Sequence, residues 1–354
     1  MVLLSSKPKP LSYLKRGARG WAYSFLKNWT LPIAIATGTL SYLIFAYVPE
    51  LDCAATTLSP VFDMLLPLTI FMTLFITFSK VDFHLMKLRK WHFCILAMQL
   101  LLVALLVIIA QSSSPFFSAK LILEAVLICI IAPCASASPV VTAKLGGDLT
   151  QMTTFVLLSS VVTSLLIPAV FPMLEPDHGT TFLAAFLTIL HRLALVLLLP
   201  LVLGAIVRHW VKPLYQWFLH TPDLGFYCWS VSLAITSGIT MKNIVHSGAG
   251  WSLLSIIALL TLLTSFIQFR IGRSIGQAFG EHICTGQAMF QKNTGLAIWI
   301  AYTYLTPVAS IGAGCYVLWQ NIINSYELWR HRRSAASAAD TTTATTTSQR
   351  NTRP

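Results

Sequence analysis

The stretch "GQAMFQKNTGLAIW", residues 286–299, places Lys292 in the middle of an apolar run. Gln291 and Asn293 flank this lysine, and Gly295 follows it. A lysine at the centre of a bilayer costs at least about 2.5–3.5 kcal/mol on insertion scales, so it is rarely kept there without a partner or a role. Three consecutive polar residues and a glycine therefore predict a membrane helix that is interrupted at an ion or substrate site.

A second interruption, "APCASASPVVTAKLGGD", lies at residues 132–148. Proline lacks the backbone donor of a helix and clashes with the preceding turn, and Pro133 and Pro139 bracket this segment. The hydroxyl-bearing residues Ser136, Ser138 and Thr142 lie between and just after the two prolines. This pattern predicts a second broken helix with polar side chains at the point where the helix opens.

The two interruptions lie roughly 150 residues apart. Backbone groups that a break releases must be satisfied inside protein or by water in a cavity. Freed carbonyls can bind cations, and half-helix N-termini can bind anionic groups of a substrate. The alternative is a pair of proline kinks that serve only helix packing, but two breaks in matching positions favour a transport site.

Membrane helices must position these breaks, because 56% of the 354 residues are hydrophobic and only 10% are charged, against about 25% charged in soluble domains. Windows of roughly 17–25 apolar residues mark candidate spans. Ten are predicted, at 30–48, 60–79, 91–111, 119–145, 149–172, 190–208, 224–244, 251–270, 279–302 and 304–326, with 180–190 at the membrane interface. The fold class is therefore an all-α membrane protein of two inverted five-helix repeats, 30–172 and 180–326, whose discontinuous helices 4 and 9 cross.

Lysine and arginine cluster in alternate connections, which predicts that both termini lie in the cytoplasm. The tail compositions favour the cell inner (plasma) membrane as the location. Residues 1–29 form a basic cytoplasmic tail, and residues 327–354 are predicted to be a disordered cytoplasmic tail. The net charge of +12 thus reflects membrane topology, and nucleic acid is not a predicted partner. Glu124 is expected at the outer rim, near a helix end.

Four stretches give the chain a resemblance to the bile acid:sodium symporter family over nearly all of its membrane region. They are "LFITFSKVDFHLMKLRKW", "ILAMQLLLVALL" with Gln99, "SASPVVTAKLGGDLT" with Thr142, and "NTGLAIWIAYTYLTPVASIGAGCYVLWQN" with Asn293. The resemblance implies a ten-helix fold with a panel domain and a core domain that work by alternating access. It also implies sodium-coupled transport of bile acids or similar organic anions.

The chain departs from the family pattern at the residues that the resemblance assigns to sodium. In the ninth span the family's Glu, Gly and Gln positions are Ala288, Phe290 and Lys292. The family's Ser-Asn pair in the fourth span becomes Ser138 and Pro139, and the hydroxyl ligands of its fifth span fall on Met152 and Val156. Sodium needs oxygen ligands, which side chains of Ala, Pro, Met and Val do not supply.

These departures lead to the hypothesis that the Lys292 ammonium stands where a sodium ion sits in the family. Its expected partners are oxygens around the crossing, namely Ser136, Ser138, Thr142, Asn293, Gln99 and freed carbonyls, and Gln291 is a further candidate of the substrate or ion site. The amine could exchange a proton or meet an anionic substrate during transport. The alternative is a fixed structural cation.

The predicted function is secondary active transport of an organic anion, with the small anion and the lipid bilayer as partners. No cofactor is expected apart from Na⁺ or H⁺ as a coupling ion, and no residue set is assigned to a metal, because the seven cysteines have no metal-ligand spacing. Two alternatives are a cation/proton antiporter or proton-coupled transporter that uses Lys292, and a non-transporting membrane sensor. An enzyme is not predicted, since the sequence has no HExxH, GxSxG or phosphate-binding glycine loop.

Overall fold

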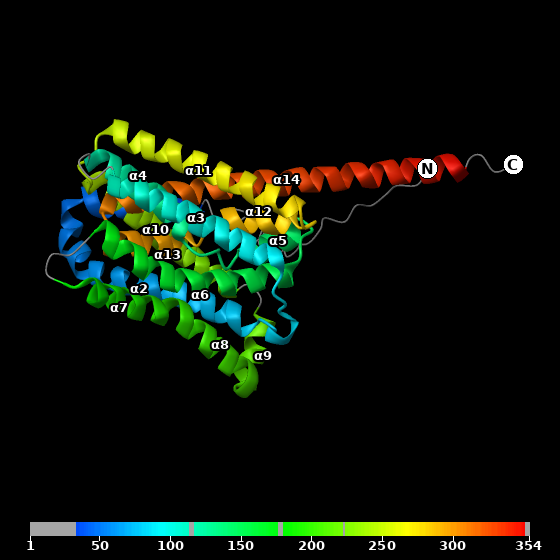
Figure 1. Ribbon diagram of the computed structural model, residues 1–354, viewed down its shortest axis with the longest axis horizontal. Helices are drawn as coiled ribbons and strands as arrows, with labels where there is room; N and C mark the ends of the chain where they lie inside the picture. Colours follow the sequence, from blue (N-terminus) through cyan, green and yellow to red (C-terminus); the bar gives the residue numbers. More distant parts are fainter. Residues whose placement is uncertain (1–32, 113–116, 176–179, 222–223, 351–354) are drawn as a thin grey trace, which may run out of the picture.

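The computed structural model describes residues 33–112, 117–175, 180–221 and 224–350, so the predicted tail 1–29 lies outside the described residues. Figure 1 shows the described helices gathered in a bundle. The helices are Ile33–Tyr47, α2 (Asp52–Ser79), α3 (Lys90–Ser112), α4 (Phe117–Ile131), α5 (Ser138–Lys144), α6 (Leu149–Leu174), α7 (Phe182–Leu193), α8 (Leu199–Trp210), α9 (Lys212–His220), α10 (Leu224–His246), α11 (Trp251–Gln277), α12 (His282–Phe290), α13 (Thr294–Tyr304) and α14 (Pro307–Arg350). Two short 3-10 helices, Pro49–Leu51 and Phe83–Leu85, and a π-helical turn, Ala194–Leu198, complete the elements.

Four continuous helical segments in the described residues are long and apolar enough to cross a bilayer: Lys90–Ser112, Leu149–Leu174, Phe182–Trp210 and Trp251–Gln277. The apolar helices Ile33–Tyr47 and Met64–Ser79 are shorter. These helices confirm the predicted class, an all-α membrane protein. The ten-span inverted repeat stays a prediction.

The helices pack in two groups that meet at the broken helices. In one group α2 packs against α8 and α10, and in the other α4 packs against α3, α11 and α14. Close approach depends on small residues: a Cβ at Gly312 of α14 would lie 2.5 Å from the carbonyl oxygen of Ala125 in α4. The second broken helix, α12–α13, contacts elements of both groups, including α11, α14, α2 and α10.

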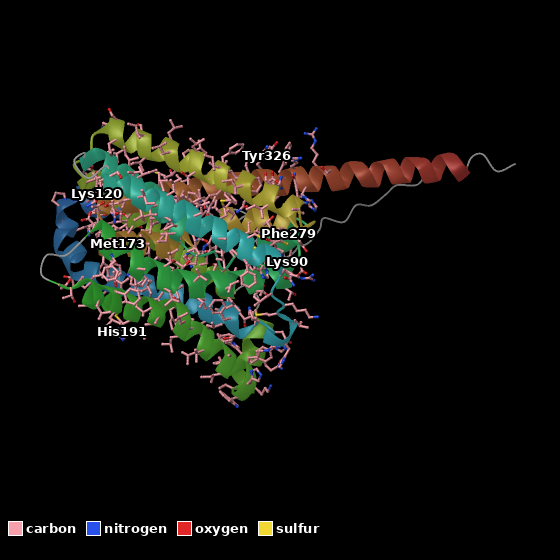
Figure 2. The ribbon with its side chains drawn as sticks, viewed as in Figure 1. Lys90, Lys120, Met173, His191, Phe279 and Tyr326 are labelled. Carbon is pink, nitrogen blue, oxygen red and sulfur yellow. The ribbon has the colours of Figure 1, made fainter. Side chains whose placement is uncertain are left out.

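Figure 2 shows which residues share an end of the bundle. Lys120 and Met173 lie at one end, while Lys90 and Phe279 lie at the opposite end. The sequence assigns the first end to the outer side of the membrane and the second to the cytoplasm, so each broken helix runs from one side toward the other.

Two boundaries differ from the sequence prediction. Residues 182–210 form one helical segment, whereas the sequence analysis separates an interfacial stretch 180–190 from a span that starts at 190. The segment contains no glycine or proline before Pro200 that would end the helix. Its one irregular stretch is the π-helical turn Ala194–Leu198, which lies inside the helical segment without interrupting it.

The last helix, α14, continues to Arg350, whereas the sequence analysis predicts disorder from residue 327. The final part of α14 extends beyond the bundle in Figure 1. Alanine has the highest intrinsic helix propensity, and five alanines between residues 334 and 350 compensate for the many threonines there.

Candidate functional site

The two interruptions lie against each other and pair through their backbones. The Ala135 amide donates to the Gln291 carbonyl at 2.9 Å, and the Asn293 amide donates to the Pro133 carbonyl at 2.8 Å. These bonds form an isolated antiparallel bridge centred on Cys134 and Lys292. Each break therefore satisfies backbone groups that the other one releases, which hydrocarbon could not do.

Side chains from neighbouring helices satisfy most of the remaining backbone groups at the breaks. Gln99 of α3 donates from Nε2 to the carbonyls at the end of α4, at 3.0 Å to Ile130, 3.2 Å to Ile131 and 3.3 Å to Ala132. The structure thus places the predicted ligand Gln99 as a cap on the first break. On the second break, Gln320 of α14 accepts from the Lys292 amide at 3.1 Å and donates to the Lys292 carbonyl at 3.3 Å.

Lys292 is buried, with 1% of its surface exposed. Its partner across the backbone bridge is Cys134, which is also 1% exposed. Within the described part of the chain, no carboxylate forms an ion pair with Lys292, and its ammonium makes no hydrogen bond to the oxygens predicted as its partners. The structure therefore places Lys292 at the crossing, as the sequence predicts. The predicted pairing of its ammonium with nearby oxygens stays a prediction.

The other predicted residues divide between the crossing and its surroundings. Ser138 donates to the Ala135 carbonyl at 2.7 Å and lies 3.1 Å from the Cys134 sulfur, so it shares a neighbour with Lys292. Thr142 Oγ1 and Gln291 Oε1 are buried and have no hydrogen-bond partner among the described residues. Ser136 and Asn293 face a pocket beside the crossing.

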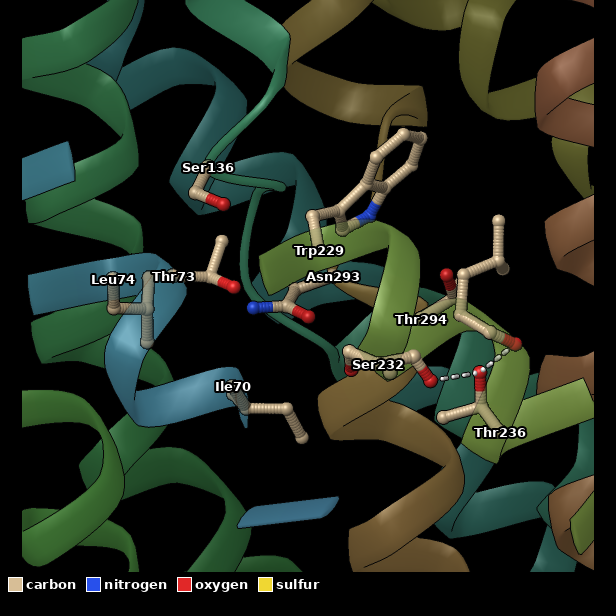
Figure 3. A pocket seen from close by; sticks show the side chains of 11 residues that line it. Ile70, Thr73, Leu74, Ser136, Trp229, Ser232, Thr236, Asn293 and Thr294 are labelled. Carbon is tan, nitrogen blue, oxygen red and sulfur yellow. Dashed lines mark hydrogen bonds between the residues drawn. The ribbon is translucent and has the colours of Figure 1, made fainter. Parts of the chain in front are cut away.

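This pocket lies between the crossing and the helices α2 and α10. Figure 3 shows Ser136, Thr73 and Asn293 facing the same space. The lining residues are Ile70, Thr73, Leu74, Ser136, Trp229, Ser232, Leu233, Thr236, Asn293, Thr294 and Gly295. None of them carries a charge, so the pocket offers hydroxyls, one amide and an apolar wall.

Hydrogen bonds within the protein decide which polar groups are left for a ligand. The Asn293 side chain caps α13, because its Oδ1 accepts from the Leu296 amide at 3.2 Å. This bond leaves the Nδ2 amide as a donor, and no hydrogen bond among the described residues uses it. Thr73 and Thr236 direct their hydroxyl protons to backbone carbonyls of their own helices, at 2.7 and 2.9 Å.

The pocket therefore presents donors suited to an anion. The Asn293 amide and the Ser136 and Ser232 hydroxyls can donate, and the N-terminus of α13 adds the positive end of a helix dipole. Lys292 does not line the pocket, but it adjoins Asn293 in the same break and contributes a buried positive charge. Sequence reasoning identified Ser136 and Asn293 but missed Thr73, Ser232 and Thr236.

Three of the positions that the resemblance assigned to sodium have side chains without oxygen. Ala288, Met152 and Val156 are buried apolar side chains, at most 1% exposed. The described residues also contain no group of three or more His, Cys, Asp or Glu side chains that could hold a metal ion.

Comparison with known families gives one match. Residues 64–247 match the model of the Sodium Bile acid symporter family, which confirms the resemblance seen in the sequence. The match includes α3, α4, α5 and α10, and hence the first break and part of the pocket. No curated protein matches the chain.

Proposed function

Because the chain belongs to the sodium bile acid symporter family, we propose that it is a secondary active transporter of an organic anion. Family members are transporters and not enzymes, and the family match and apolar helices make this a multi-pass membrane protein. The proposed solute is a bile acid or a similar carboxylate, and the proposed location is the plasma membrane with both termini in the cytoplasm.

The observation that carries the proposal is the orientation of Asn293 in the pocket. Its oxygen is committed to the N-terminus of α13, so its Nδ2 amide is the atom available to a ligand. A carboxylate accepts such a bond, and the α13 dipole attracts the same charge. The apolar wall formed by Ile70, Leu74 and Trp229 suits the hydrocarbon part of an amphipathic anion.

We propose that transport occurs by alternating access, with ten spans arranged as two inverted repeats. The pocket lies where the α2–α10 group meets the crossing, so a rigid-body movement of one group against the other would expose it to either side. The backbone bonds between the two breaks join them into one unit, which would move together.

We further propose that Lys292 supplies the positive charge that sodium supplies in a symporter of this family. The buried amine lies in the second break, and the positions assigned to sodium ligands hold Ala288, Met152 and Val156. Transport of the anion then does not depend on a sodium gradient. Sodium-coupled uptake, or proton movement driven by sodium as in an antiporter, would contradict this part of the proposal.

Uptake of radiolabelled cholate into proteoliposomes tests the proposal, with Asn293→Asp as the decisive variant. Aspartate keeps an oxygen that can cap α13, but it replaces the Nδ2 donor with a negative oxygen. A hydrogen bond to a charged group contributes about 1.5–3 kcal/mol, so uptake at low cholate concentration should fall at least roughly tenfold.

Asp148→Asn is the matched control, because Asp148 caps α6 by accepting from the Thr150 and Gln151 amides at 2.8 and 3.0 Å, outside the pocket. This exchange should leave uptake unchanged, since asparagine is an equally good N-cap. The proposed function would be contradicted if Asn293→Asp took up cholate as fast as the wild type. It would also be contradicted if wild-type proteoliposomes took up no more cholate than protein-free vesicles.

A further inference from the structure

Glu124 is fully buried in α4, with 0% of its surface exposed, although the sequence places it at the outer rim. The sequence prediction is wrong here, because the wall around Glu124 comes from elements distant in the chain. One carboxylate oxygen, Oε2, accepts from the Thr306 hydroxyl at 3.2 Å. The other oxygen, Oε1, is buried and has no hydrogen-bond partner among the described residues.

Two charged groups face Glu124. Glu175, directly after α6, lies near Glu124, because both carboxylates are within 4 Å of the Lys120 ammonium. Lys120, one turn earlier in α4, lies 2.7 Å from Glu175 Oε1 but 3.9 Å from Glu124 Oε1. Two carboxylates thus share one cation, and that cation is closer to Glu175.

The other elements packed against α4 contribute no further charge at this end. Charged residues of α3, α11 and α14 lie at their opposite ends, with Lys90, Arg270 and Glu327 the nearest to the membrane centre. α13 contributes no charged residue, and its junction with α14 contributes the Thr306 hydroxyl. Asp177 and His178 follow Glu175 in the sequence and lie outside the described residues.

Two neighbouring carboxylates that share a single lysine cannot both remain ionised when one of them is buried. An ionised Glu124 Oε1 would be a buried acceptor without a donor. A proton bound to this oxygen turns it into a donor, which can then bond a neighbouring carboxylate oxygen. We propose that Glu124 and Glu175 form a proton-binding site at the outer end of the bundle, in which a proton on Glu124 Oε1 is donated to a Glu175 oxygen. Release returns this proton to the outer medium, because the Glu175 side chain is 35% exposed.

The site joins the two broken helices at their outer ends. Glu124 belongs to α4, and Thr306 follows α13 and also accepts from the Ala309 amide in the first turn of α14 at 3.2 Å. Loss of the proton would leave two negative charges beside one lysine, and their repulsion would separate the end of α6 from α4. Proton binding would therefore bias the position of the crossing, a consequence that rests on the proposed transport function.

Infrared spectroscopy of the purified full-length protein tests the site without any transport. At about pH 6 an ordinary glutamic acid, with a pKa of about 4.3, is almost fully ionised. The wild type should nevertheless show the carbonyl band of a protonated carboxylic acid at this pH. The band should be lost in Glu124→Gln, where Lys120 keeps Glu175 ionised, and in Glu175→Gln, where the glutamine amide donates to the Glu124 carboxylate.

Glutamine has the shape of glutamic acid and keeps a donor between the two side chains, so both variants should fold, and each alone can decide the question. Glu50→Gln, a change at an exposed carboxylate, is the control and should keep the band. A wild type without the band, or a band that survives in either variant, overturns the proposal.

A second measurement connects the site to transport. If the proposed function also holds, cholate uptake by the wild type should change with the outer pH, and uptake by Glu124→Gln should not. A band without any cholate uptake would support the proton site and contradict the proposed function, so the two failures are distinguishable. Uptake by Glu124→Gln that follows outer pH as in the wild type would overturn the link between the site and transport.

Discussion

Replacement of Lys292 by methionine separates a functional charge from a structural one. The two side chains are similar in length, but methionine removes the ammonium. Lys292 is 1% exposed, and no carboxylate among the described residues forms an ion pair with it. A buried charge without such a partner lowers stability, so we expect Lys292→Met to be more stable than the wild type and inactive in transport.

The magnitude follows from the environment of the ammonium. A lysine at a bilayer centre costs about 2.5–3.5 kcal/mol on insertion scales, and an apolar residue costs nothing there. Part of this cost is already offset in the folded protein, because Lys292 lies among the polar backbone groups of the two breaks, opposite Cys134. We therefore expect a gain of about 1–3 kcal/mol in the free energy of unfolding, or roughly five- to 150-fold in the folding equilibrium.

Denaturant titration in bicelles measures the stability, and cholate uptake measures the function. Lys144→Met is the control, because Lys144 is exposed at the end of α5 and its replacement should change neither quantity. A loss of about 3–5 kcal/mol in Lys292→Met would refute the reasoning, since this is the cost of removing one partner from a buried ion pair. Lys292 would then be a structural cation.

Three further predictions concern side chains that hold the bundle together. Gln99→Leu leaves the carbonyls at the end of α4 without their shared donor and should lower the free energy of unfolding by about 1–3 kcal/mol. Thermal unfolding measures this loss, and an unchanged midpoint would contradict the capping role of Gln99. Gly312→Val would force α14 away from the Ala125 carbonyl and should lower the free energy of unfolding by about 1–3 kcal/mol. Gly250→Val is the control: no atom lies within 4 Å of its Cβ position, so the change should stay within about 0.5 kcal/mol. Equal losses in the two variants would show that packing at Gly312 is loose. Arg208→Ala breaks the 2.6 Å ion pair with Asp82. Because both side chains are partly exposed, the free energy of unfolding should fall by at most about 1 kcal/mol, and by less in high salt. A larger loss that salt does not change would show that the pair is not a solvent-screened surface ion pair.

Sequence reasoning located the two breaks because local chemistry determines them. Pro133 and Pro139 end a helix in any context, and the polar run before Gly295 interrupts the apolar pattern of its span. The structure shows helix ends at Ile131 and Phe290, next to these signals. The spacing of the breaks also indicated that they would meet, which the bonds between residues 133–135 and 291–293 show.

The remaining features depend on contacts between distant segments, and the sequence contains no local signal for them. Gln99 could be read as an ion ligand, but its position against α4 makes it a cap. Thr73 and Ser232 sit in apolar helices where a hydroxyl commonly bonds its own backbone, so only the packing of α2 and α10 places them beside the pocket. Glu124 was assigned to the rim because the wall that buries it includes Thr306, 182 residues away.

Binding of radioactive sodium to the purified wild-type protein tests most directly whether a lysine has replaced the ion at the crossing. The measurement needs no knowledge of the transported solute. We predict no saturable binding, because the amine of Lys292 already provides the positive charge and Ala288, Met152 and Val156 offer no oxygen. Saturable binding that unlabelled sodium displaces would contradict the account, since the ion and the amine would then both be present.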